Sequence, residues 1–88
     1  MAGFIKKDKW FVYLARCSDN SIYTGITKNV AARIEKHNTG KGARFTSSRR
    51  PVALVYQEKH QNRVSAMKRE LEIKSWPKKK KLLLAREN

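Results

Sequence analysis

The chain has 88 residues and carries 21 lysine and arginine residues against 7 aspartate and glutamate residues, a formal net charge of +14 with histidine neutral. This length allows one domain, and a hydrophobic fraction of 40% excludes a disordered polycation. So one-sided a charge predicts an anionic partner, and nucleic acid is the first candidate because its binding depends on neutralising phosphates.

The single cysteine, Cys17, excludes an internal disulfide and a cysteine-based zinc site, and it suits a reducing compartment. The first ten residues, "MAGFIKKDKW", lack the apolar core of a signal peptide. No stretch approaches the ~20 apolar residues of a membrane span. These features predict a cytoplasmic protein with no membrane partner.

Strands and helices are predicted in a simple order. Residues 9–17 and 21–26 have the aromatic and β-branched content of two strands joined by a turn, and 51–59 of a third strand. Three helices are predicted from their spacing and start signals: residues 30–38 after Thr27 or Asn29, a helix after Asn62 that includes 65–73, and residues 77–88 from Pro77.

The order β-β-α-β-α-α is typical of an α+β fold, here a three-stranded antiparallel sheet flanked by helices. We expect one domain over residues 1–88, with loosely ordered ends at 1–8 and 86–88. Residues 39–50 are predicted to form a loop with two glycines and four cations.

Glu70 lies where an apolar residue is expected. At about 100° per residue, it falls between Ala66 and Met67, in an arc that also holds Val64, Leu71 and Ile73. The opposite, solvated side is predicted to hold Lys68, Arg69 and Glu72. A buried carboxylate costs several kcal/mol unless it is paired or binds a metal. Glu70 is therefore either an ion-pair partner of Lys74, four residues on, or a metal ligand.

Two further pairs could line a pocket. Arg33 and His37 are one helical turn apart beside Val30 and Ile34, although a lone histidine on such a face is more often a core residue. Tyr13 and Tyr23 lie on adjoining predicted strands, which ordinary cross-strand packing would also explain.

Together these residues resemble the GIY-YIG nuclease family. Tyr13 in "FVYL" and Tyr23 in "YTGIT" are followed in the same order by Arg33, His37 and a helical Glu70, and "HNTGKGARFT" and "RRPV" are similar to the small stand-alone bacterial members. The resemblance extends from Trp10 to about Leu84.

The resemblance implies a nuclease that hydrolyses phosphodiester bonds in DNA with low sequence specificity, in DNA repair or processing. It implies that Tyr13 activates or positions the attacking water and that Tyr23 lies near that water or the scissile phosphate. Arg33 would stabilise charge on the phosphoryl oxygens, and His37 would orient a group or relay a proton. Glu70 would bind one divalent metal, most simply Mg²⁺, or another such as Mn²⁺.

The chain departs from the family pattern in two places. "Phe11-Val12-Tyr13" lacks the glycine of the first motif, and the asparagine that larger members carry after the metal glutamate has no counterpart before Asn88. Larger members also carry a separate DNA-binding domain, for which this chain has no room. Nucleic acid, with DNA favoured over RNA, is therefore expected to contact loop and terminal-helix cations: Lys41, Arg44, Arg49, Arg50 and Lys78 to Lys81.

Two other functions fit the charge. One is a nucleic-acid-binding module with vestigial or absent catalytic activity, and the other is a protein-interaction module in a repair complex. Only the set of Tyr13, Tyr23, Arg33, His37 and Glu70 separates a nuclease from these, because a pure binder needs no carboxylate in an apolar arc. A shared site also makes a geometric demand, because neighbouring residues of a strand face opposite ways. A two-residue loop at Asp19-Asn20 would put Tyr13 and Tyr23 on opposite faces, so a shared site predicts an odd-numbered connection or a bulge.

Overall fold

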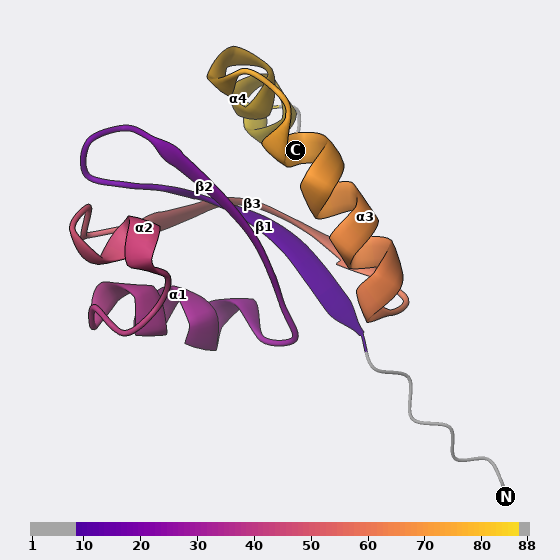
Figure 1. Cartoon of the computed structure of the whole chain (residues 1–88), viewed down its shortest axis with the longest axis horizontal. Helices are drawn as coiled ribbons and strands as arrows, with labels where there is room; N and C mark the ends of the chain where they lie inside the picture. Colours follow the sequence, from indigo (N-terminus) through magenta and orange to yellow (C-terminus); the bar gives the residue numbers. More distant parts are fainter. Residues whose placement is uncertain (1–8, 87–88) are drawn as a thin grey trace, which may run out of the picture.

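A computed structural model describes residues 9–86. Its elements follow the predicted order (Figure 1): β1 (Trp10–Arg16), β2 (Ile22–Thr27), α1 (Val30–Asn38), α2 (Arg44–Ser47), β3 (Ala53–His60), α3 (Arg63–Lys74) and α4 (Lys78–Arg86). The α+β class and the three-stranded antiparallel sheet are confirmed. The loop 39–50 contains one helical turn, α2, that was not predicted. The expected loose ends 1–8 and 87–88 lie outside the described residues, whereas Arg86 ends α4.

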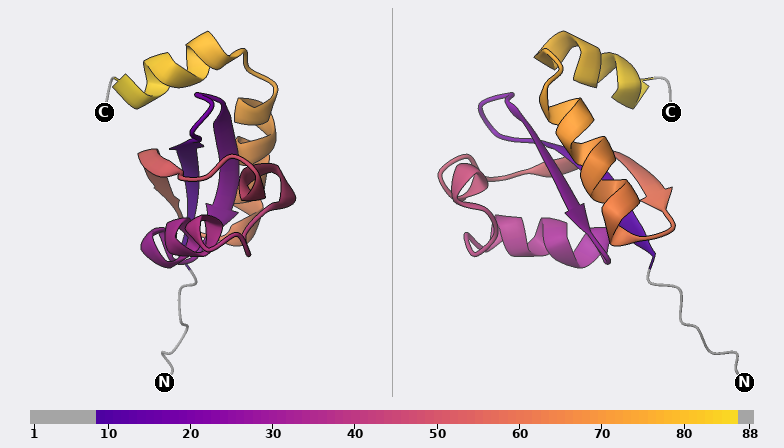
Figure 2. Two further views of the ribbon diagram at one scale, coloured as in Figure 1. Left: turned by 90° about the vertical axis from the view of Figure 1, so that its left-hand side faces the viewer. Right: turned by 45° about the vertical axis from the view of Figure 1, so that its right-hand side comes forward.

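The sheet has the strand order β2-β1-β3, so β1 is central and β2 is an edge strand. Helices α1 and α2 lie on one face and α3 on the other, while α4 lies near the end that carries the β1–β2 turn (Figure 2). Each face has its own core. Tyr13, Ala15, Cys17, Val30 and Val52 form the first. The second consists of Val12, Leu14, Ala66 and Ile73.

The β1–β2 hairpin puts the two motif tyrosines on one face. Tyr13 pairs with Gly25, and Ala15 pairs with Tyr23. Residues 17–21 form the connection, an odd length of five, in which the Cys17 amide donates to the Ser21 carbonyl at 2.9 Å. Asn20 adopts the left-handed conformation, at φ 69°, that asparagine tolerates. The predicted odd connection is confirmed.

The predicted orientation of α3 is wrong in part. Ala66 and Ile73 are fully buried, but Val64 and Leu71 of the expected apolar arc are 61% and 64% exposed. Met67 is also exposed. The buried face is shifted toward Arg69, which the sequence placed in solvent and which contacts β3 instead. Glu70 nevertheless remains on the protein-facing side, with a side chain 16% exposed.

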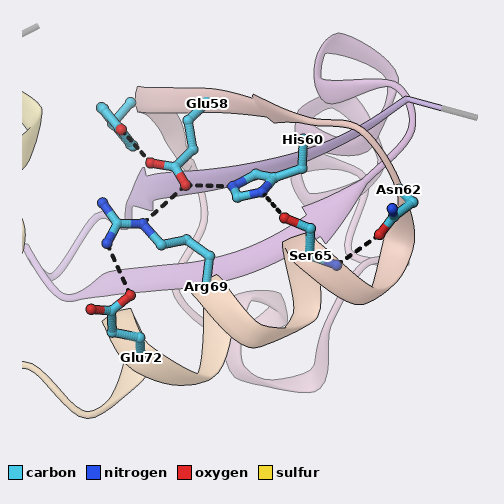
Figure 3. A network of polar contacts seen from close by, with 7 residues as sticks. Glu58, His60, Asn62, Ser65, Arg69 and Glu72 are labelled. Atoms are coloured by element: carbon cyan, nitrogen blue, oxygen red, sulfur yellow. Dashed lines mark hydrogen bonds and ion pairs between the residues drawn. The ribbon is translucent and has the colours of Figure 1, made fainter.

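A polar network between β3 and α3 explains this rotation (Figure 3). Oε2 of Glu58 accepts a hydrogen bond of 3.0 Å from Nε of Arg69 and lies 2.6 Å from Nε2 of His60. Nδ1 of His60 lies 2.7 Å from Oγ of Ser65, in the first turn of α3. Arg69 and Glu70 flank the line of Ala66 and Ile73 on opposite sides. The network at β3 therefore turns Glu70 toward the other edge of the sheet, at β2.

Candidate active site

The candidate site lies along the β2 edge, where the helices of the two faces approach each other. The sheet provides Tyr13 and Tyr23, and α1 provides Arg33 and His37. Glu70 comes from α3, on the other face, and its carboxylate acts electrostatically on Tyr13. The structure therefore brings these five predicted residues to one region of the protein, where Tyr13 and His37 are buried.

The centre of the site is a buried chain of hydrogen bonds. The hydroxyl of Tyr13 lies 2.7 Å from Nε2 of His37, and Nδ1 of His37 lies 2.7 Å from Oγ1 of Thr46 in α2. Thr46 in turn donates to the carbonyl of Ala43 at 3.0 Å. Tyr13 is 1% exposed, and His37 and Thr46 are fully buried. This chain fixes the Tyr13 hydroxyl from the inside.

The donor and acceptor roles in this series of hydrogen bonds are assigned from its inner end, at Thr46 and Ala43. We assign Nδ1–H of His37 as the donor to the Thr46 oxygen, because the Thr46 hydroxyl donates to the carbonyl of Ala43. Nε2 is then the unprotonated nitrogen and accepts the Tyr13 proton. The Ala43 amide lies 3.4 Å from Nδ1 and would donate to it only in the other tautomer. The Tyr13 oxygen thus remains an acceptor, and Arg33 acts on it as a side-chain donor.

Burial sets the protonation of both residues. Desolvation raises the pKa of Tyr13 to about 12, against the lowering effect of Arg33 beside it. Desolvation, and secondarily the charge of Arg33, lowers the pKa of His37 below its ordinary 6.5. At neutral pH the site therefore holds a neutral phenol bonded to a neutral imidazole.

Tyr23 forms the more open part of the site. Its ring packs edge-on against His37, with centroids 5.0 Å apart, and lies 6.0 Å from the ring of Phe45. Gly25 makes this arrangement possible. A Cβ at Gly25 would lie 2.7 Å from the Tyr13 hydroxyl and 2.9 Å from Cε2 of Tyr23, distances that real Cβ atoms do not reach. Glycine is required by the close approach of these rings.

A second glycine lets the 39–50 loop reach the site. A Cβ at Gly42 would come within 3 Å of the ring and Cα of His37. Asn38, at the end of α1, fixes the far end of the loop just before β3. Its side chain donates to the Val52 carbonyl at 3.0 Å and accepts from the Val52 amide at 2.7 Å. The loop is thereby held close enough for Thr46 to contact His37.

Glu70 forms the ion pair that its sequence position suggested, and it also lies near the candidate site. Its Oε2 lies 3.4 Å from Nζ of Lys74, so the predicted ion pair exists. The side chain of Lys74 is 50% exposed, however, and that of Glu70 only 16%. Glu70 is also close enough to Tyr13 to act on its pKa, while it pairs with the half-exposed Lys74.

The carboxylate fits only one kind of metal site. No group of three or more His, Cys, Asp or Glu side chains within residues 9–86 could enclose an ion. A cage made entirely of protein ligands is therefore not available there. Mg²⁺ is commonly held by one or two carboxylates, with substrate phosphate oxygens and water as its other ligands. Glu70, beside cations that attract phosphate, fits that arrangement.

The four loop cations differ in how they are held. Nε of Arg49 donates to Oδ2 of Asp19 at 3.1 Å, and its Nη1 donates to the Phe45 carbonyl at 2.7 Å. Arg50 donates through Nε to the Ser47 carbonyl at 2.9 Å. Lys41 and Arg44 are exposed and make no such contact with residues 9–86. Two of the predicted phosphate ligands thus also brace the loop.

The cations of α4 also fall into two groups. Lys78, Lys79 and Lys80 are exposed, whereas Lys81 is half-buried and points toward the β2 edge near Lys74. Nζ of Lys80 lies 4.3 Å from the centre of the Trp76 ring. None of the helices within residues 9–86 is sufficiently long and apolar to span a membrane.

Thr46 and Phe45 were missed by sequence reasoning. Both lie in α2, a segment of four residues that is too short for a helical periodicity. The available signal was indirect: "GKGARFT" is part of the stretch that resembled the small bacterial members, but no spacing connects it to His37.

Comparison with known proteins identifies the family of the chain. The GIY-YIG catalytic domain matches residues 9–83. A "UPF0213 protein" of Staphylococcus aureus is 55% identical over 80 residues, covering 91% of this chain and 98% of its own length. The solution NMR structure of a UPF0213 protein from Bacillus halodurans superposes with a TM-score of 0.55 at 41% identity, covering 86% of this chain and 81% of that one. The solution NMR structure of a protein from E. faecalis superposes with a TM-score of 0.59 at 36% identity, covering 85% of this chain and 80% of that one. The chain belongs to the GIY-YIG family, among small relatives that consist of little more than this domain.

Proposed function

We propose that this protein is a divalent-metal-dependent nuclease that hydrolyses phosphodiester bonds in DNA with low sequence specificity, in DNA repair or processing. The family supports a nuclease and a nucleic-acid substrate. The observation that carries the proposal is the buried 2.7 Å contact between Tyr13 and His37, beside Arg33 and the carboxylate of Glu70. A module that only binds phosphates has no use for a carboxylate in such a site.

Glu70 is the proposed metal ligand, and Mg²⁺ or another divalent cation such as Mn²⁺ is the proposed cofactor. When bound, such an ion neutralises phosphate charge and acidifies a bound water. Without a metal ion, the Glu70 carboxylate is paired with Lys74. Because Lys74 is half-exposed, it can leave Glu70 at the cost of a surface ion pair, worth about 0–1 kcal/mol.

Tyr13 is proposed to orient the attacking water and not to act as a standing phenolate. With a pKa of about 12, it is protonated at neutral pH. Its proton is directed to Nε2 of His37, so its oxygen can accept a hydrogen bond from water. Tyr23, which is more exposed, is proposed to hold the same water or a phosphate oxygen from the other side.

Arg33 is proposed to stabilise the negative charge that develops on the phosphoryl oxygens. It lies at the edge of α1, beside the Tyr13 hydroxyl and close enough to lower the pKa of His37. A fixed cation at such a position acts mainly on the transition state, and losing an electrostatic stabiliser typically costs ~10²–10³ in rate.

Low sequence specificity is proposed because the exposed cations suit phosphate contacts. Lys41 and Arg44 extend from the 39–50 loop, and Lys78 to Lys80 from α4. Phosphate contacts fix the position of a nucleic acid but do not read its bases. Affinity should therefore fall steeply with salt and vary little with sequence.

A binding module without activity is the alternative. It explains the charge equally well, and the missing family asparagine is compatible with it. The two functions are distinguished by incubating the purified protein with plasmid, single-stranded and branched DNA, in Mg²⁺ or in chelator. Nicking that requires Mg²⁺ and disappears in a Glu70→Gln variant purified in parallel supports the nuclease. Binding without nicking on any of these substrates would contradict it.

A further inference from the structure

A pocket opens on the β2 edge beside the candidate site. It has a volume of about 310 Å³, at the lower limit of the ~300–1,000 Å³ typical of small-molecule pockets. Side chains from the sheet and from three helices meet there: Ile22, Tyr23, Thr24, Phe45, Lys74 and Lys81. The pocket shares Tyr23 with the site and reaches Glu70 through the Lys74 ion pair. A ligand of the site would therefore extend into it.

One side of the pocket is aromatic. Phe45 is 40% exposed, and its ring lies 6.0 Å from that of Tyr23 at a 30° tilt. The guanidinium of Arg49 lies 4.0 Å from the Phe45 ring centre and is tied to Asp19, so the ring is held in place from behind. An exposed aromatic ring beside a proposed phosphate site is the kind of surface on which nucleobases stack.

The opposite side is cationic. Lys74 and Lys81 both line the pocket. Desolvation lowers the pKa of Lys81, with the charge of Lys74 adding to the effect. Two lysines crowded in this way attract an anionic group between them.

The edge strand adds polar groups at the wall. Cys17 and Ser21 form a hydrogen-bonded pair of the hairpin, and hydrogen-bonded pairs alternate with non-hydrogen-bonded ones along two antiparallel strands. Thr24 falls at a non-hydrogen-bonded position. Its backbone N–H and C=O therefore point away from β1. The hydroxyl of Thr24 is also buried without a hydrogen-bond partner within residues 9–86. The outward-facing N–H and C=O groups of an edge strand are of the kind that can pair with the edge of a base.

We propose that this pocket is a nucleobase subsite, which takes the base of an unpaired nucleotide next to the phosphate held in the candidate site. Phe45 and Tyr23 provide the stacking surface, and Lys74 and Lys81 hold the adjoining phosphate. This inference rests on the proposed function, because it treats the neighbouring site as a phosphodiester site. Since a base inside a duplex is already stacked and paired, the substrate class is single-stranded or locally unpaired DNA.

Binding in chelator tests the subsite without requiring cleavage. Fluorescence anisotropy compares a short single-stranded oligodeoxynucleotide with an abasic oligonucleotide of the same length and phosphate number. We expect the wild-type protein to prefer the oligonucleotide that has bases. Phe45→Ala should weaken its binding about 5- to 150-fold, the range typical of one stacked base, and leave abasic binding nearly unchanged. Phe45→Trp should retain the preference.

Lys41→Ala is the matched control, because it removes an exposed cation outside the pocket and should weaken both ligands equally. If folded Phe45→Ala keeps the full preference for bases, or if the wild type has none, the subsite does not exist. The nuclease proposal is judged separately by Mg²⁺-dependent nicking. A base preference lost in Phe45→Ala supports the subsite even if no DNA is cleaved.

Discussion

The hydroxyl of Tyr13 and Nε2 of His37 lie 2.7 Å apart in the core, although 24 positions separate them in the chain. The contact connects the central strand to α1, and Thr46 extends it to α2 at 2.7 Å. Neither Tyr13 nor His37 can move without breaking a buried hydrogen bond. This rigidity is what a group that orients a reacting water requires.

Thr46 should be a positioning residue. Thr46→Val removes the acceptor of Nδ1–H and leaves a buried donor unsatisfied, which costs about 1–3 kcal/mol of stability. It also releases the His37 tautomer, so nicking should fall at least about tenfold. Thr46→Ser keeps the hydroxyl and should retain most of the stability and most of the nicking activity. Equal activity of the valine and serine variants, measured as nicking rate at saturating Mg²⁺, would remove Thr46 from the site.

The buried histidine predicts a dependence of stability on pH. Desolvation and the charge of Arg33 lower the pKa of His37 in the folded protein, so near pH 6.5 and below the unfolded chain binds the proton more readily. The free energy of unfolding should therefore decrease as pH falls below about 6.5. His37→Gln should flatten this part of the curve. NMR of the imidazole of His37 should show the neutral form at pH 6.5, and a charged ring at that pH would contradict the assignment.

The Glu58 network should stabilise α3 and set its rotation. Burial raises the pKa of Glu58, but hydrogen bonds from Tyr56, His60 and Arg69 outweigh it and lower the pKa below 4.5. Their stabilisation is present above that pH and is lost as pH falls through the lowered pKa. Glu58→Gln should reduce the free energy of unfolding at pH 7 by about 2 kcal/mol, since charge-assisted bonds are replaced. Denaturant titrations at pH 7 and pH 4 would measure this, and an unchanged midpoint at pH 7 would contradict it.

Loop cations should separate into two kinds by mutation. Lys41→Ala with Arg44→Ala should weaken DNA binding about equally for all sequences and reduce the salt slope by about 1.4–1.8, the value for two phosphate contacts. The melting temperature should stay nearly constant. Arg49→Ala should lower it, because this side chain holds Asp19 and the Phe45 carbonyl. A sequence preference that survives high salt would contradict phosphate-dominated binding.

The hairpin and the position of Glu70 were within reach of the sequence because both follow local rules. Strand alternation required an odd connection, and 17–21 provides it. Helical spacing placed Glu70 on the protein-facing side. The same spacing placed Arg69 in solvent, because apolar periodicity carries no information about Glu58, a partner 11 positions away.

Contacts set by tertiary structure were not predictable. Thr46 reaches His37 only because Gly42 allows the loop to pass close to the ring. Nothing in the four residues of α2 indicates this. The bracing of Arg49 by Asp19 likewise depends on how the hairpin turn meets the loop, 30 positions later in the chain.

Glu70→Gln tests the central claim most directly, with nicking in Mg²⁺, DNA binding in chelator and a thermal melt on the same preparation. Loss of a metal ligand should abolish Mg²⁺-dependent nicking. Binding should be retained or slightly tighter, because a negative charge beside phosphate is removed. The melting temperature should not fall, since the Lys74 released by the change is half-exposed and stays solvated. Lys74→Ala serves as the ion-pair control. The proposed site is contradicted if Glu70→Gln nicks DNA at the wild-type rate and melts at a lower temperature. Lys74→Ala would then melt at a lower temperature as well, and Glu70 would be only an ion-pair partner.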